Sequence, residues 1–224
     1  MKESGMKKPT LTKPGMARPP IRQPTAKAVI AGVTIRPVAP GDRRAIEDLF
    51  GTRGACAGCW CMHWRLPRGG QLWREMQGEP NKRAFFKLLA AKRLRALIAE
   101  VEGVPRGEPV GWCSFGPRSD FPKLERSRVF HRAKAAPMTW SVVCFFIKPA
   151  WRGQGLATSL LRAATASALA QGASEIEGFP ALHREGAALT PAFAWTGVAE
   201  MFEAAGYCPT ESTTGRRLYL KSPV

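Results

Sequence analysis

The stretch WSVVCFFIKPAWRGQGLAT, residues 140–158, decides how this sequence is expected to fold. Its first eight residues form a nearly continuous apolar and β-branched run, which is typical of a strand covered on both faces. A proline and two glycines follow, and Leu156 then opens a pattern of apolar residues at helical spacing that ends at Gly172. The stretch therefore predicts a central strand joined to a helix by a glycine-rich turn.

The segments on either side of this unit predict a mixed α/β sheet flanked by helices. Before it, the pattern indicates a strand at 33–38, a helix at 42–50, a helix from Pro80 to about Arg93, and a β-hairpin of 96–102 and 109–117. After it come a strand at 176–179, a helix at 198–205 and closing strands between 207 and 220. We expect residues 31–224 to form a single α/β domain with a strand, helix, strand unit near its middle.

Residues 1–30 differ from the rest in composition. They hold seven Lys or Arg, one Glu and five prolines, with no apolar period, so they cannot bury enough surface to offset the entropy of ordering. We predict a basic, proline-rich, disordered tail. The whole chain has 34 basic and 17 acidic residues and a net charge of +17, which suits an anionic cofactor, an acidic substrate or a polyanion. Nucleic-acid binding through the tail is thus a hypothesis, though not the favoured one.

Composition also excludes several classes of protein. The chain has 224 residues, of which 45% are hydrophobic, which excludes wholesale disorder. No run approaches the ~18 uninterrupted apolar residues of a membrane span, and the N-terminus lacks the apolar stretch of a secretory signal. A cytoplasmic protein without membrane association is expected, and its six cysteines are expected to be thiols.

The turn at 148–158 carries the most informative chemistry. Successive backbone N–H groups at a helix N-terminus can hold a pyrophosphate, because the helix dipole adds partial positive charge there. Gly153 and Gly155 let phosphates approach the backbone, and Arg152 adds a fixed charge. This turn resembles that of the GNAT superfamily of acyl-CoA N-acyltransferases. The family's signature is Arg or Gln, two residues, Gly, one residue, then Gly or Ala, and it is matched by Arg152, Gly155 and Ala157.

A second likeness lies at 201–207, which resembles the family's late helix leading into an aromatic-containing strand, and the resemblance extends over roughly 33–221. It implies that the strands at 140–147 and 174–179 splay apart around the pantetheine arm of acetyl-CoA. Backbone groups near 143–147 would pair with the pantetheine, and the turn would hold the pyrophosphate. The cofactor-binding residues implied are Val143, Phe145, Ile147, Arg152, Gly153, Gln154, Gly155, Leu156, Ala157 and Thr158.

The implied activity is acetyl-CoA-dependent N-acetyltransfer to the primary amine of a small molecule or peptide, by direct attack in a ternary complex. The sequence departs from the family at the usual acid, because the late-helix Tyr is replaced by Phe202, which cannot donate a proton. The central strand also lacks the Glu that some members place near its start. Glu177 is the candidate base; the alternative is a solvated Glu near a strand end. The missing Tyr leaves open a catalytically inactive acyl-CoA-binding module.

The segment CAGCWCMHWR, residues 56–65, is the most unusual in the chain. If it were extended, Cys59, Cys61 and His63 would share one face and could form a zinc set. On a straight strand these residues spread over ~13 Å, so no metal is expected. Two other interpretations remain: small core cysteines, or a wall of the acceptor pocket, where the resemblance places this part of the chain. In the second, the contacts would come from Trp60, His63, Trp64 and Arg65.

Overall fold

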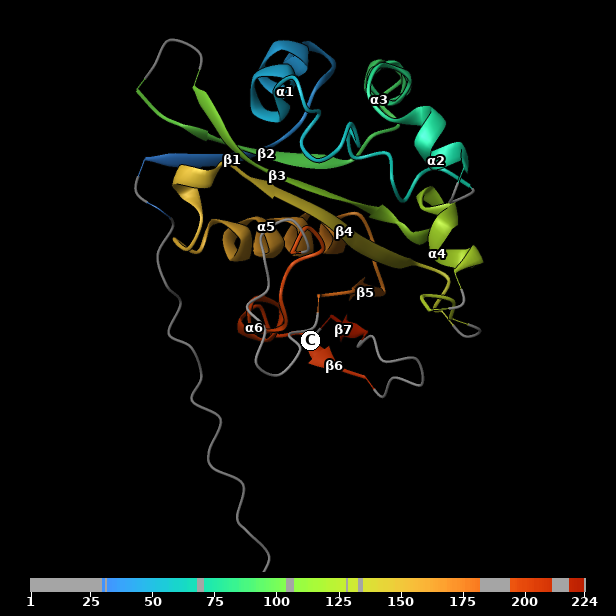
Figure 1. Cartoon of the computed structure of the whole chain (residues 1–224). Helices are drawn as coiled ribbons and strands as arrows, with labels where there is room; N and C mark the ends of the chain where they lie inside the picture. The colour runs from blue at the N-terminus through green and yellow to red at the C-terminus, as the bar shows by residue number, and fades with distance from the viewer. Residues whose placement is uncertain are drawn as a thin grey trace, which may run out of the picture.

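The computed structural model describes residues 30, 32–67, 71–103, 107–127, 129–132, 135–181, 194–210 and 218–223. The predicted tail, apart from Ile30, lies outside these ranges. The described strands form one seven-stranded sheet in the order β1-β2-β3-β4-β5-β7-β6 (Figure 1). Their bounds are β1 Val33–Pro37, β2 Ala96–Val101, β3 Glu108–Pro117, β4 Thr139–Ile147, β5 Glu175–Gly178, β6 Cys208–Pro209 and β7 Tyr219–Lys221. Only the β4–β5 pair is parallel.

Helices cover both faces of this sheet. One face lies under α1 (Arg43–Phe50) and α3 (Glu79–Ala90), and the other under α5 (Leu156–Ala170) and α6 (Ala199–Ala204) (Figure 1). Two short helices that the sequence did not predict, α2 (Gln71–Met76) and α4 (Pro122–Arg126), lie beside the end of the sheet. The expected mixed α/β class with a helix-flanked central sheet is confirmed. None of the helices in the described ranges has the length and apolarity needed to cross a membrane.

The predicted central strand is β4, whose first five residues, 139–143, are all buried. The apolar stripe of α5 packs on the sheet, because its buried positions recur every three or four residues: Leu156, Leu160, Leu161, Ala164 and Ala168. A Cβ placed on Gly111 of β3 would lie 3.1 Å from the side chains of Leu156 and Leu160, so glycine there lets the helix approach closely. This packing fixes the N-terminus of α5 beside the end of β4.

The expected separation of β4 from β5 is confirmed. Their pairing runs from Thr139–Glu175 to Val142–Gly178 and goes no further. Beyond this point β4 contacts a different segment, since the Phe145 N–H donates to the Trp195 carbonyl at 2.7 Å. The two strands therefore part in the second half of β4, on the side where α5 begins.

Candidate active site

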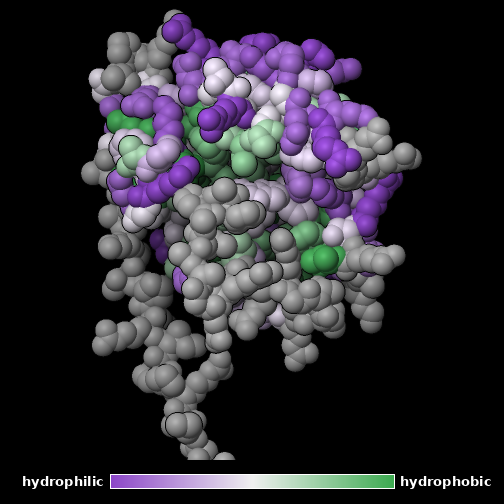
Figure 2. All heavy atoms as spheres, viewed as in Figure 1, coloured by the Kyte–Doolittle hydropathy of each residue, from purple (hydrophilic) through white to green (hydrophobic). Residues whose placement is uncertain are grey.

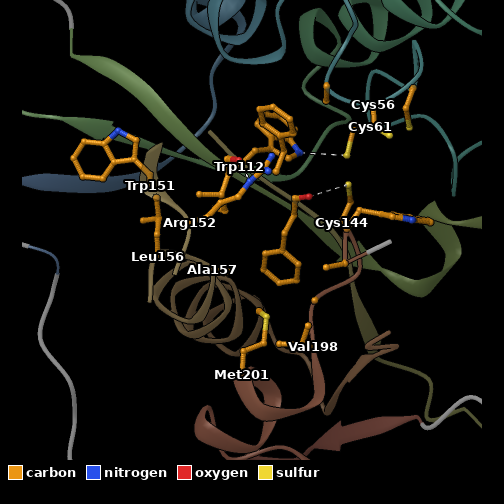
Figure 3. Close-up of a pocket in the computed structure, with 18 of the residues that line it drawn as sticks. Cys56, Cys61, Trp112, Cys144, Trp151, Arg152, Leu156, Ala157, Val198 and Met201 are labelled. Carbon is orange, nitrogen blue, oxygen red and sulfur yellow. Dashed lines mark hydrogen bonds between the residues drawn. The ribbon is translucent and has the colours of Figure 1, made fainter. Parts of the chain in front are cut away.

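A cavity of about 770 Å³ lies where β4 and β5 part. It extends from the turn that opens α5, along β4, to the turns at 55–63, as the labelled side chains in the close-up show (Figure 3). Figure 2 shows apolar residues near the middle of the visible face, with hydrophilic residues around them. Its walls come from segments far apart in the sequence: Phe50, Ala55, Cys56, Ala57, Cys59, Cys61, His63, Trp73, Trp112, 144–147, 151–153, 155–158, Ala194, Trp195, Gly197, Val198 and Met201.

The turn before α5 has the geometry of an anion site. Gly153 and Gly155 adopt φ of 73° and 84°, a conformation that glycine takes without strain, and a Cβ on either would meet open space. Among the described residues, no carbonyl or side-chain acceptor takes a hydrogen bond from the N–H groups of 153–158. These amides stand at the positive end of a 15-residue helix. The combination is the one that binds phosphate groups at helix N-termini.

Two side chains stabilise this turn from within. The Arg152 Nε donates to the Ile147 carbonyl at 3.0 Å, and the Gln154 Nε2 donates to the Ala150 carbonyl at 2.8 Å. Arg152 is exposed and lines the cavity, so its guanidinium adds positive charge at the mouth. Eight of the ten predicted cofactor residues line the cavity; Val143 and Gln154 do not.

The backbone of β4 presents alternate residues to the edge from which β5 has parted. The Val143 carbonyl accepts a bond from the Trp64 indole at 2.9 Å, and the Phe145 N–H is used by Trp195. Because alternate residues of a strand direct their backbone groups to the same edge, the Phe145 carbonyl and the Ile147 N–H face the cavity too. The chain itself thus already uses part of the edge that the resemblance implied for pantetheine.

Glu177 does not line this cavity, which goes against the expectation that it is the base. Its side chain is fully buried and outside the cavity wall. Arg118 donates to one carboxylate oxygen, Ser141 Oγ lies 2.6 Å from the same oxygen, and Arg132 Nη1 lies 3.0 Å from the other. The alternative of a solvated Glu is wrong, because Glu177 is a buried anchor.

The late helix places no acid in the described wall of the cavity. Phe202 is fully buried in the core, and the Tyr207 hydroxyl is buried against Thr165 Oγ1 at 2.7 Å. Burial, partly offset by the bond to Thr165, raises the pKa of Tyr207. Neither residue lines the cavity. As far as the described residues show, the cavity wall contains no Asp, Glu or Tyr.

The segment at 56–65 is folded into turns, so the extended arrangement considered for zinc does not occur. Ala55, Ala57, Trp60 and Cys61 all have positive φ, a conformation that strands do not contain. In the described ranges no three His, Cys, Asp or Glu side chains are grouped to hold a metal ion.

The four predicted acceptor residues separate into core and cavity. Trp60 is buried between α1 and α3, with its ring 5.7 Å from that of Phe50. Trp64 is buried and bonded to β4, and Arg65 is buried against Asp120 at 3.8 Å. Only His63 lines the cavity. The interpretation as small core cysteines is confirmed for Cys61, which belongs to a core cluster while also bordering the cavity, and is wrong for the exposed Cys56. A role of this segment in holding the acceptor stays a prediction.

His63 lies in an aromatic surround. Its ring centroid is 5.1 Å from Trp64, 5.0 Å from Trp73 and 4.9 Å from Trp195. Lys123 Nζ lies 2.7 Å from His63 Nε2. Burial, and then the charge of Lys123, lower the pKa of His63 to about 4, so the imidazole is neutral at neutral pH.

The cavity residues that sequence reasoning missed include Trp73, Trp112 and Cys144. Alternation along the central strand carried a usable signal for Cys144: if Phe145 faces α5, Cys144 faces the opposite side, toward α1. Trp73 had no such signal, because the short helix α2 that positions it was not predicted.

The comparisons with known proteins agree with this geometry. A family model described as the acetyltransferase (GNAT) family matches residues 62–187, more than half of the chain. The chain belongs to this family of acetyltransferases. No curated protein matches the sequence.

Several solved structures are similar to the chain. The ribosomal-protein-S5-alanine acetyltransferase from Vibrio fischeri has 11% identity and a TM-score of 0.49, covering 87% of this chain and 95% of that one. The aminoglycoside acetyltransferase AAC(6')-Ib, in complex with coenzyme A, has 16% identity and a TM-score of 0.49, with coverages of 85% and 94%. The PaiA N-acetyltransferase from Thermoplasma acidophilum, also in complex with coenzyme A, has 12% identity and a TM-score of 0.48, with coverages of 85% and 99%.

Proposed function

We propose that this protein transfers an acetyl group from acetyl-CoA to a primary amine, by direct attack of the amine on the thioester in a ternary complex. The observation that carries the proposal is the set of unbonded amides at 153–158, which open onto a cavity that continues along the free edge of β4. The residues present suit the donor. The amides and Arg152 would hold its pyrophosphate, and the Phe145 carbonyl and Ile147 N–H would pair with its pantetheine.

The end of the cavity away from the turn before α5 indicates which class of amine is the acceptor. Its described wall is formed by aromatic rings, thiols and a neutral imidazole, and no acidic side chain lies in it. With no carboxylate in the described wall, a polycation would lose the hydration of several charges there without a carboxylate partner for each of them. An amine next to an apolar or aromatic group would instead bury its apolar part against Trp73, Trp112 and Trp195. We therefore favour amines of this second class.

A thiol-release assay with acetyl-CoA and a panel of amines tests the proposal. The panel should pair arylalkylamines with polyamines and aminoglycosides, and calorimetry should record acetyl-CoA binding in parallel. We expect coenzyme A release with the apolar amines and little with the polycations. Binding of acetyl-CoA with no thiol release on any amine would identify an acyl-CoA-binding module instead. Absence of acetyl-CoA binding would overturn the interpretation of the turn.

A further inference from the structure

Direct attack requires a group that takes a proton from the acceptor, because an ammonium has no lone pair. In the described wall of the cavity, the side chains able to accept a proton are His63 and four cysteines: Cys56, Cys59, Cys61 and Cys144. Glu177 and Tyr207 are buried elsewhere. Within the described wall, the choice of base is therefore limited to one imidazole and these thiols.

His63 is poorly suited to the task. Its Nε2 lies 2.7 Å from the ammonium of Lys123, and burial lowers its pKa to about 4. An imidazole with so low a pKa holds a proton only weakly at neutral pH. Its three tryptophan neighbours point instead to a role in shaping the pocket.

Cys61 lies among groups that favour a thiolate. Its Sγ accepts a hydrogen bond from the Trp112 indole at 3.2 Å (Figure 3), and an indole N–H can only donate. Cys144 on β4 lies close to the same sulfur, and its own thiol contacts the Phe145 carbonyl at 3.9 Å (Figure 3). Arg65, four residues along, is a buried cation whose Nε and Nη2 have no hydrogen-bond partner among the described residues. Arg65 Nη1 pairs with Asp120 at 3.8 Å, and a negative charge on Cys61 would interact favourably with the same guanidinium.

The pKa of Cys61 and the pKa values of its neighbouring thiols shift in opposite directions. The bond from Cys144 lowers the pKa of Cys61 against the effect of burial, and Trp112 and Arg65 add to the lowering. Burial and the charge of Cys61 raise the pKa of Cys59 to about 12. The bond to Cys61, followed by burial, raises that of Cys144. One thiol of the cluster is thus favoured as the charged form, and it lines the cavity.

We propose that Cys61, as a thiolate, is the general base of the reaction; this inference rests on the proposed function. The sulfur takes one proton from the acceptor's ammonium, and the freed nitrogen lone pair forms the C–N bond to the acetyl carbonyl carbon. The carbon–sulfur bond of the thioester breaks, and a second proton from the nitrogen passes to the departing coenzyme A thiolate. Cys61 then returns its proton to solvent. No group is oxidised or reduced.

Substitution with a matched control tests the role. Cys61→Ser should lower kcat/KM by about 100-fold or more, the usual contribution of a positioned base, with acetyl-CoA affinity unchanged. Cys61→Asp should restore part of the lost rate, because a carboxylate can accept the proton. The control is Cys113→Ser, a buried cysteine of β3 outside the cavity wall, which should keep the wild-type rate. Full activity in Cys61→Ser would overturn the proposal while leaving the acetyltransferase function standing.

The pH dependence of the reaction distinguishes a catalytic from a structural role of Cys61, because a structural role would leave the pH profile unchanged. The titratable or charged groups that face Cys61 are Cys59 and Arg65 on its own segment, Cys113 on β3 and Cys144 on β4. The acid limb of kcat/KM should coincide with the pH midpoint of Cys61 alkylation by iodoacetamide, followed by peptide mass spectrometry. Cys144→Ala removes the neighbouring thiol that lowers the pKa of Cys61, so both should move to higher pH.

The alkylation measurement needs no turnover, so it also separates the two hypotheses. A midpoint at or above that of an ordinary thiol would overturn the base role even if amines are acetylated. An acetyl group found on Cys61 after incubation with acetyl-CoA alone would overturn it too, because the sulfur would then be a nucleophile. No thiol release from a protein that binds acetyl-CoA would refute the proposed function, and with it the base role.

Discussion

At the scale of single residues, the cluster around Glu177 shows how the sheet accommodates a buried carboxylate. Glu177 lies on β5 and is bound by Arg118 and Arg132, which come from segments 59 and 45 residues earlier in the chain. Ser141 of β4 donates to the same carboxylate. The cluster therefore links β5 to the segments before and within β4, one residue pair before the pairing ends at Val142–Gly178.

Replacing Glu177 with Gln should reduce stability rather than chemistry. The substitution leaves two guanidinium groups beside a neutral amide, and breaking a buried pair in this way costs about 3 kcal/mol. We expect urea unfolding to show a loss of that order, while kcat per folded molecule stays within a factor of two or so of wild type.

The matched control is Glu175→Gln on the same strand. Glu175 also pairs with Arg132 but is partly exposed, so its loss should cost less than about 1 kcal/mol. If Glu177→Gln instead kept full stability and lost turnover, the carboxylate would have to be returned to a catalytic role.

At the scale of elements, α5 has a glycine with a left-handed backbone at each end. Gly155 at its N-terminus has φ of 84° and Gly172 beyond its C-terminus has φ of 85°, and a Cβ on either would meet nothing within 4 Å. An alanine would thus cause the same backbone strain at both ends, about 1 kcal/mol, without a clash. Only Gly155 lies in the cavity wall.

Gly155→Ala should therefore weaken acetyl-CoA binding more than Gly172→Ala does. Strain at Gly155 turns the amides of 153–158 away from their common direction, whereas strain at Gly172 does not reach them. We expect calorimetry to give a dissociation constant at least tenfold higher for the first variant and unchanged for the second, with similar losses of stability in urea. Equal affinities in the two variants would contradict the assignment of the turn to the pyrophosphate.

The sequence predicted those elements whose pattern is long and regular, and missed features that depend on distant partners. The apolar run of β4, the helical spacing of α5 and the glycine turn between them all recur in the structure as expected. The helices α2 and α4 have six and five residues, too few for an apolar period to stand out.

The site was harder to predict for the same physical reason. The partners of Glu177 are remote in sequence, so a local pattern could not distinguish an anchor from a base. Trp60 and Cys61 have positive φ although neither is glycine, and propensity does not indicate such a turn. The extended conformation assumed for 59–64 is therefore wrong, although Cys59, Cys61 and His63, which it placed on one face, do all line the cavity.

At the scale of the whole molecule, the sheet has two parts, β1 to β4 and β5 to β7. Few strand pairs join them, but they share one packed core. Only four residue pairs link β4 to β5. One core cluster nevertheless includes residues from the first strand to the last, among them Val33, Val142, Leu160, Phe202 and Tyr219. Since α5 lies in the middle of this cluster, we expect the two parts to unfold together.

Acetyl-CoA should then stabilise the entire fold in one step. A ligand at a hundred times its dissociation constant adds about 2.7 kcal/mol to the free energy of unfolding when it binds only the folded state. Tryptophan fluorescence reports mainly on the part before β5, and far-ultraviolet circular dichroism on the whole sheet, so both midpoints should shift together. Acetylated pantetheine without the nucleotide is the control; lacking the pyrophosphate for the amides of 153–158, it should stabilise far less. If the fluorescence and dichroism midpoints separate, or if the two ligands act equally, the cofactor does not bind across the opening between β4 and β5 as the fold suggests.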